Sequence, residues 1–150
     1  MTRDPIPQEF SRPLRLATIP PGGYRIDVAA NSVECRALAR RFDLPSLATL
    51  SCTFALSREP GAVVRASGHL LARVTRICRL TLEQFPADVA EHFVVLFVQS
   101  GHESAAFDPE TPDEIPYANG VIDLGEATAE QLALALDPWP RKPDVTPHVS

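Results

Sequence analysis

Two long stretches in the middle of the chain alternate apolar and polar side chains, and this period of two constrains the fold more than any other feature. They are SLATLSCTFALS, residues 46–57, and VVRASGHLLARVTRICRLTL, residues 63–82. Strict alternation is typical of half-buried β-strands, and the intervening REPGA is typical of a hairpin turn. We therefore expect an antiparallel pair in which 63–82 forms one bent strand or two, with Gly68 as the bulge.

Shorter segments with β-strand character flank this pair. After a loose lead-in over residues 1–9, residues 10–19 look extended, and further strands are expected at 24–29, 89–100 and 121–124. Successive strands joined by short turns predict an α+β protein with a mainly antiparallel sheet, either a meander or a partly open barrel.

Two short helices complete the predicted fold. The first covers residues 31–42, with a capping box between Asn31 and Glu34 and an apolar stripe at helical spacing. The second follows a capping box between Thr128 and Gln131 and runs to residue 136.

The second helix ends in DPWPRKP, because its prolines cannot continue a helix. Trp139, between two of these prolines, is either a lid over the end of the core or an exposed anchor for a partner. We expect burial, since a large aromatic side chain gains most from leaving water.

The length of 150 residues suits one domain spanning 1–150, with a loose tail over 145–150. No apolar window is long enough to cross a bilayer and no secretory signal is present, so we expect a cytoplasmic protein with no membrane partner. Cys35, Cys52 and Cys78 form no CxxC pair, and we expect them to be apolar core residues.

Charge is distributed unevenly along the chain. Residues 1–82 hold twelve arginines and six acidic residues, whereas residues 83–150 hold thirteen acidic residues and two basic ones. Such asymmetry indicates a nucleic-acid partner for the basic half and an acidic arm in the other, although both sets can simply solvate a surface. The acidic residues concentrate in a predicted loop over residues 101–119, which carries Glu103, Asp108, Glu110, Asp113 and Glu114.

Signatures of catalysis are absent from the sequence. It contains no phosphate-binding glycine loop, no zincin motif and no nucleophile elbow, and its four histidines lie far apart. We therefore expect a binding protein without catalytic residues, metal, cofactor or small-molecule substrate. A small enzyme with a cryptic site near His92 or Cys78 is kept as an alternative interpretation.

The segments SLATLSCTFALS, ASGHLLARVTRICRLTLEQFPADVAEHFVVLF and IDLGEATAEQLALALDPWPRKPD together resemble the YceD-like family, which is linked to accumulation of large-subunit ribosomal RNA in bacteria and plastids. The CxxTLE sequence and the proline-rich tail are similar to the alphaproteobacterial branch. The resemblance runs from Phe10 to Asp144. Two departures are visible. Many members have CxxC at this site, whereas here Thr81 stands in place of the second cysteine, so zinc binding does not transfer. Gln84 replaces a proline of the branch.

The resemblance implies a non-enzymatic role in biogenesis of the large ribosomal subunit, and two mechanisms stay open. In the first, the protein binds precursor rRNA or an early assembly particle through arginines that contact phosphates. These arginines are Arg36, Arg40, Arg41, Arg73 and Arg79. In the second, it is an adaptor whose acidic C-terminal half, including the loop residues given above, binds a basic ribosomal protein. Few aromatic residues accompany the arginines, so base stacking is not predicted.

Overall fold

The computed structural model describes residues 9–104 and 110–142, so most of the expected lead-in and all of the expected tail lie outside these ranges. The elements in chain order are β1 (Pro13–Arg15), the one-turn 3₁₀ helix η1 (Leu16–Thr18), β2 (Tyr24–Ala29), α1 (Ser32–Arg41), β3 (Ser46–Glu59), β4 (Val63–Ile77), β5 (Gln84–Gln99), β6 (Asp113–Tyr117), β7 (Val121–Asp123) and α2 (Leu124–Ala135).

The centre of the fold is an open five-stranded sheet in the order β2-β3-β4-β5-β6. The strands from β2 to β5 form an antiparallel meander, and β6 joins the edge in parallel with β5. A separate two-stranded sheet pairs β1 with β7. The predicted α+β class with a mainly antiparallel sheet is therefore confirmed, and of the two alternatives the structure has the meander rather than the barrel.

β4 is one continuous strand of 15 residues, and the predicted bulge at Gly68 is wrong. Gly68 pairs in regular register with Phe54 on one side and Phe93 on the other. A Cβ atom here would lie 2.2 Å from a carbon of the Phe93 ring, which meets Phe54 edge-on at 5.8 Å. Gly68 thus makes room for an aromatic ring. The irregularity of this hairpin lies instead in β3, between Leu47 and Thr49.

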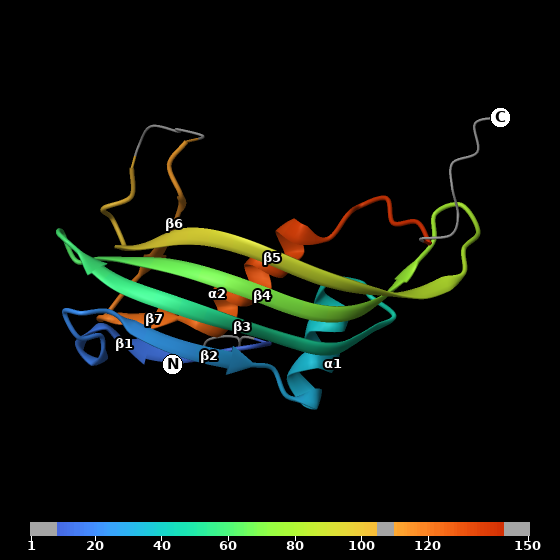
Figure 1. Cartoon of the computed structure of the whole chain (residues 1–150), viewed down its shortest axis with the longest axis horizontal. Coiled ribbons are helices and arrows are strands. Elements are labelled where there is room, and N and C mark those ends of the chain that lie inside the picture. Colours follow the sequence, from blue (N-terminus) through green and yellow to red (C-terminus); the bar gives the residue numbers. More distant parts are fainter. Residues whose placement is uncertain (1–8, 105–109, 143–150) are drawn as a thin grey trace, which may run out of the picture.

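The two faces of the sheet differ in what covers them. Figure 1 looks onto an uncovered face, which we call the outer face, with α1 and α2 behind the strands. The opposite, inner face holds the apolar core, in which the two helices pack against the strands. Cys35 and Cys52 belong to this core, as predicted. Its other members include Leu38 of α1, Leu50 and Phe54 of β3, Leu70 and Val74 of β4, Val95 and Phe97 of β5, and Leu124 and Leu132 of α2.

α1 begins and ends as the sequence predicts. The Asn31 side chain accepts a hydrogen bond from the Glu34 amide, and the Glu34 carboxylate accepts one from the Asn31 amide, both at 2.8 Å. The capping box is therefore confirmed. At the other end Asp43 adopts a left-handed conformation with φ of 56°, and the Leu44 amide donates to the Ala39 carbonyl. This turn closes the helix before the chain enters β3.

α2 begins at Leu124, five residues before Ala129, where the predicted helix starts. Asp123 caps it, since one carboxylate oxygen accepts from the amides of residues 125–126 at 3.0 and 3.1 Å. Thr128 is instead buried inside the helix, where its hydroxyl donates to the Leu124 carbonyl at 2.8 Å. The predicted capping box of Thr128 and Gln131 is wrong, because Asp123, five residues earlier, already accepts from the free amides of residues 125 and 126.

β6 lies inside the segment 101–119 that the sequence predicts to be a loop. Its residues pair in parallel with residues 95–99 of β5. The Tyr117 side chain is buried, and its hydroxyl donates to the Ala62 carbonyl in the turn between β3 and β4. Pro116 is tolerated because β6 is an edge strand. The acidic, proline-bearing composition of this segment does not predict a strand, because β6 forms through its pairing with β5.

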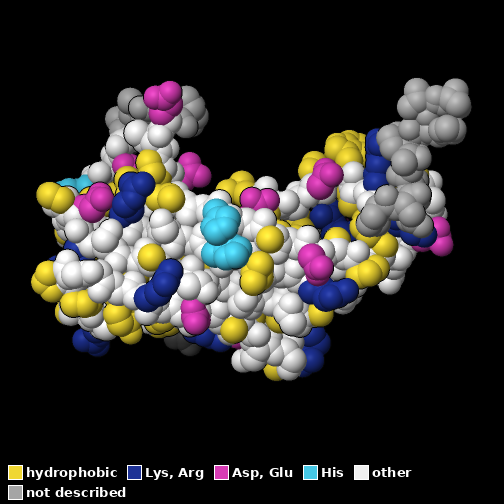
Figure 2. All heavy atoms as spheres, viewed as in Figure 1, with side chains coloured by type: hydrophobic (Ala, Val, Ile, Leu, Met, Phe, Trp, Pro, Cys, Tyr) yellow, Lys and Arg dark blue, Asp and Glu magenta, His cyan; other side chains and the backbone are white. Residues whose placement is uncertain are grey.

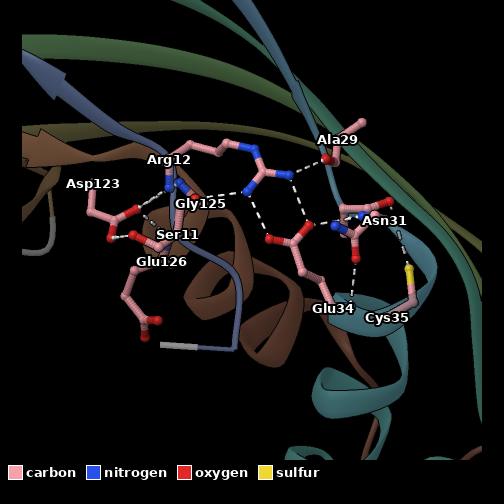
Figure 3. A network of polar contacts seen from close by, with 10 residues as sticks. Ser11, Arg12, Ala29, Asn31, Glu34, Cys35, Asp123, Gly125 and Glu126 are labelled. Carbon is pink, nitrogen blue, oxygen red and sulfur yellow. Dashed lines mark hydrogen bonds and ion pairs between the residues drawn. The ribbon is translucent and has the colours of Figure 1, made fainter. Parts of the chain in front are cut away.

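A group of polar contacts, which we call the clasp, joins the N-terminal segment to both helices (Figure 3). Asp123, while it caps α2, also accepts from the Ser11 hydroxyl at 2.6 Å and the Arg12 amide at 2.8 Å. The Arg12 guanidinium donates to both carboxylate oxygens of Glu34, at 2.7 and 2.8 Å, and to the Ala29 carbonyl at 2.8 Å. The clasp thus fixes the starts of α1 and α2 relative to each other.

Replacement of Gly125 by alanine should destabilise the protein. The added Cβ would lie 2.7 Å from the Phe10 carbonyl oxygen and 2.9 Å from the Arg12 amide nitrogen, and backbone atoms cannot move aside locally. We expect a loss of about 1–3 kcal/mol in urea unfolding, against a gain of up to about 1 kcal/mol for alanine at an unconstrained helical site. Gly22→Ala is the matched control, because its Cβ meets nothing within 4 Å. A Gly125→Ala protein as stable as this control would contradict the close packing.

Glu34→Gln should weaken the clasp at neutral pH and lose its effect in acid. The hydrogen bond from Arg12 outweighs burial and lowers the pKa of Glu34 below its ordinary value of 4.5. The charged carboxylate therefore stabilises the fold above that value, and this contribution disappears as the pH falls through the lower pKa of the folded state. Urea unfolding should show a loss of about 1–3 kcal/mol at neutral pH. A difference that is independent of pH would argue against this ion pair.

Candidate nucleic-acid interface

Three of the predicted RNA-binding arginines lie on α1, and they differ in their surroundings. Arg36 and Arg40 are exposed, and neither side chain has a hydrogen bond or ion pair within residues 9–104 and 110–142. Arg41 instead forms ion pairs with Glu126 at 3.0 Å and Glu9 at 2.9 Å. The hydrogen bond to Glu126 raises the pKa of Arg41 despite partial burial. Arg41 therefore connects α1 to α2, and its guanidinium is already engaged.

The other two predicted arginines lie elsewhere. Arg73 projects from the outer face of β4, opposite the helices, and stands 3.8 Å from Asp88. Arg79 follows the end of β4. The structure therefore separates the five arginines into three places and does not bring them together as one basic surface.

The predicted acidic residues are partly held by local contacts. The Glu103 carboxylate accepts from the Gly101 amide at 2.5 Å. Glu114 accepts from the Ser104 amide and hydroxyl at 2.6 and 2.8 Å, and the amide contact above all lowers the pKa of Glu114. Asp113 and Glu114 lie in β6, Glu110 is exposed just before it, and Asp108 lies outside the described residues.

The structure joins two segments that are far apart in the sequence: residues 76–83, which cover the end of β4 and the turn that follows it, and residues 137–142 after α2. We call this place the junction. The Arg79 amide donates to the Pro140 carbonyl at 2.9 Å, and the Arg76 guanidinium donates to the Asp137 carbonyl at 2.6 Å. An ion pair between Lys142 and Glu83 at 3.1 Å is a third contact between the two segments. These contacts hold the proline-rich tail across the end of β4.

The junction presents apolar side chains and a cation to solvent. Trp139 is 64% exposed, and the Arg79 guanidinium lies 4.6 Å from the centre of its ring, in cation–π geometry. Ile77, Leu80 and Leu82 are also exposed around it, Leu82 at 75%. Four of the seven exposed large apolar residues in the described part of the chain therefore lie at this one place.

The expectation that Trp139 is buried is wrong. The neighbouring Pro140 is buried instead, and its carbonyl accepts from the Arg79 amide, so the tail contacts the turn after β4 through Pro140 and leaves the indole in solvent. Beside the tail lies a hollow of about 300 Å³, lined in part by Phe42, Arg79 and Leu82. The indole is therefore exposed beside a hollow, and its role as an anchor for a partner stays a prediction.

Cys78 is buried beneath the turn of the junction and lies outside the main core cluster. Burial opposes ionisation of its thiol, but hydrogen bonds from the Thr81 side chain and from the amides of Lys142, Thr81 and Leu80 prevail and lower its pKa to about 7. In the core, by contrast, burial raises the pKa of Cys52 to about 12. The junction is thus a site where amides converge on a sulfur atom.

Sequence reasoning missed a pair of histidines. His69 and His92 are far apart in the chain, but the register of β4 and β5 sets them side by side, with ring centres 4.0 Å apart and planes 15° from parallel. Both side chains are exposed on the outer face. In the sequence, the two histidines can be paired only by counting residues outward along both predicted strands, 63–82 and 89–100, from the turn that joins them.

The described residues contain no cluster of three or more metal-ligating side chains. Among them there is also no helix with the length and apolar character that crossing a membrane requires.

The architecture defines a small α+β protein built on an open, mainly antiparallel sheet, with an aromatic and basic surface at one end. Residues 66–149, more than half of the chain, match the family described as large ribosomal RNA subunit accumulation protein YceD. The chain belongs to this family. No curated protein and no solved structure matches it. The matched span includes the whole junction but excludes α1, so Arg79 and Arg73 fall within the family region and the three helix arginines do not.

Ionisation of Cys78 can be followed directly through the far-ultraviolet absorbance of thiolates. We expect one thiolate to appear with a midpoint near pH 7, the value to which the surrounding amides and Thr81 lower the pKa of Cys78. Cys78→Ser should remove this transition, and Thr81→Val should move it to higher pH. Cys52→Ser is the matched control and should leave it unchanged. A first thiolate that appears only near the ordinary thiol pKa, about 8.5, would contradict the hydrogen-bonded arrangement.

Proposed function

We propose that this protein is a non-enzymatic, cytoplasmic factor that supports accumulation of large-subunit rRNA by binding precursor rRNA or an early assembly particle. Membership of the YceD family supports the process. The observation that carries the binding mechanism is the stacking of Arg79 on the exposed Trp139 within the family region.

An arginine beside an exposed indole suits RNA in two ways. The guanidinium contacts phosphates, and this contact weakens as salt rises. The indole offers a flat surface on which a base can stack, which contributes about 1–3 kcal/mol per base. This proposal replaces the expectation that stacking plays no part, because the fold places the exposed Trp139 ring beside Arg79.

The alternative, an adaptor that binds a basic ribosomal protein through its acidic half, has less support. Several carboxylates of that half have partners within the fold: Glu83 pairs with Lys142, Glu126 with Arg41, and Glu114 with Ser104. The two ion pairs offset charge that a partner would otherwise meet, and the hydrogen bonds from Ser104 occupy oxygen atoms of Glu114. The exposed leucines of the junction are compatible with a protein contact, so the experiment below separates the two mechanisms.

Substitution of both Arg79 and Trp139 by alanine should reduce recovery of large-subunit precursor rRNA with the tagged protein about tenfold or more, because stacking and a phosphate contact are lost together. The measurement is a pulldown from growing cells at low and moderate salt, with RNA and protein identified in the same eluate. The matched control combines Arg58→Ala with Val33→Ala, one cation and one exposed apolar side chain away from the junction.

The proposal fails if the double variant recovers as much rRNA as the wild-type protein. The adaptor mechanism gains support if a basic ribosomal protein persists after nuclease treatment and is lost when the acidic residues of segment 103–114 are neutralised. Charge reversal of Arg36 and Arg40 in a further variant tests whether α1 contributes to binding outside the family region.

A further inference from the structure

The outer face of the sheet is a second exposed surface, distinct from the junction. Neither helix covers it, and the side chains that project from its central strands, β3 and β4, are mostly polar. Figure 2 shows this face, with the two histidines together in its middle. Two rows of cross-strand neighbours run through it: Arg25, Ala55, Ser67 and Val94 in one row, and Asp27, Thr53, His69 and His92 in the next.

Two adjoining hollows of about 490 Å³ each lie along these rows, and they share Arg25, Ala55 and Ser67. The short side chains of Ala55 and Ser67 form the base of both hollows, and longer side chains such as Arg25 line their sides. The outer face is thus hollowed where its polar rows meet.

The first hollow is suited to an anion. Arg25 and Arg65 both line it, and no carboxylate does so in the part of the chain that the structure describes. Neither guanidinium has a hydrogen bond or ion pair to another described residue. Two arginines and nearby serine hydroxyls are the groups that contact phosphates in nucleic-acid complexes.

The second hollow is suited to a base. His69 and His92 line it, and because they stack on each other, each ring keeps one face for another aromatic ring. Along β4, His69 lies four residues from Arg65, or about 13 Å. A short stretch of extended single strand can therefore place its phosphates in the first hollow and a base against the histidines. A double helix keeps its bases stacked inside and cannot do so.

Asp27 gives the second hollow a chemical preference. It is the carboxylate that lines this hollow, and an ionised carboxylate only accepts hydrogen bonds. Guanine alone among the RNA bases offers two adjacent donors, N1–H and the N2 amino group, on its Watson–Crick edge. A carboxylate beside a stacked base thus favours guanine.

We propose that the outer face binds single-stranded RNA, with a guanine stacked on the His69–His92 pair and its flanking phosphates on Arg25 and Arg65. The observations that carry it are the two adjoining hollows, the exposed histidine stack and the two unpaired arginines. The inference rests on the proposed RNA-binding function and names a site, a strand form and a base for it.

Fluorescence anisotropy with the full chain and short labelled RNAs tests the site. The probes are a guanosine-containing single strand, its all-adenosine counterpart, and the same guanosine strand annealed to its complement. We expect the first to bind tightest and the duplex to bind weakest. Equal affinity for strand and duplex would overturn the proposal.

Variants of the histidine pair separate stacking from folding. His69→Ala with His92→Ala should weaken binding of the guanosine strand about tenfold, whereas His69→Phe with His92→Phe should keep most of the affinity because aromatic faces remain. Thr49→Ala, on β3 outside both hollows, is the control and should bind as the wild type does. Unfolding midpoints measured for all variants show that each is folded.

Two further variants test the phosphate and base contacts. Arg25→Ala with Arg65→Ala should reduce the slope of log affinity against log salt by about 1–2, since each phosphate contact contributes about 0.7 for single strands. Asp27→Asn should retain binding but lose the preference for guanosine. An unchanged slope or an unchanged preference would overturn the corresponding contact.

Failure of this inference can be told apart from failure of the proposed function. If the wild type binds RNA and the junction variants weaken binding while the histidine variants do not, the outer-face site is wrong and the proposed function stands. If the wild type binds none of the RNAs and recovers no rRNA from cells, both are wrong. If the histidine variants lose a ribosomal protein in the pulldown and retain RNA, the outer face binds protein instead.

Discussion

The clasp is the contact on which the arrangement of the molecule depends. Its Asp123 carboxylate accepts four hydrogen bonds, two from the N-terminal segment and two from the first turn of α2. Through Arg12 the same group is linked to Glu34 and hence to the start of α1. Once α2 is fixed there, the chain that leaves its other end is brought to the end of β4, where the junction forms. The place of the exposed indole thus depends on the hydrogen bonds that Asp123 accepts at the opposite end of α2.

The fold brings part of the basic first half of the sequence into contact with the acidic second half. Basic residues of the first half pair with acidic residues of the second, as Arg41 does with Glu126 and Arg73 does with Asp88. Charge of opposite sign in the two halves therefore helps them to associate, and it is not all available to partners. The cations without such partners, including Arg36, Arg40, Arg25 and Arg65, are dispersed over both sides of the sheet.

Local signals in the sequence predicted the elements well, and non-local contacts explain the rest. The capping box at Asn31 and the alternation along β4 are properties of short segments, so both were readable. The parallel pairing of β6 depends on β5 and is invisible in an acidic segment. Thr128 resembles a cap, but Asp123 stands five residues earlier with the N-terminal segment bound to it. Exposure of Trp139 follows from the tail contacting Arg79, and the histidine stack follows from strand register. Candidate sites were therefore less predictable than the sheet.

The short pairing between β5 and β6 has a consequence for how molecules of this protein meet one another. β6 covers only residues 95–99, so no described strand pairs with residues 84–94 on that side of β5. An open edge of this length is a template for strands of other molecules and invites aggregation. Two residues counter it: Pro86 has no amide hydrogen to donate, and Glu91 places a charge in the alternation that faces the core. The protein can thus keep a long uncovered sheet while its free edge discourages fibrous association.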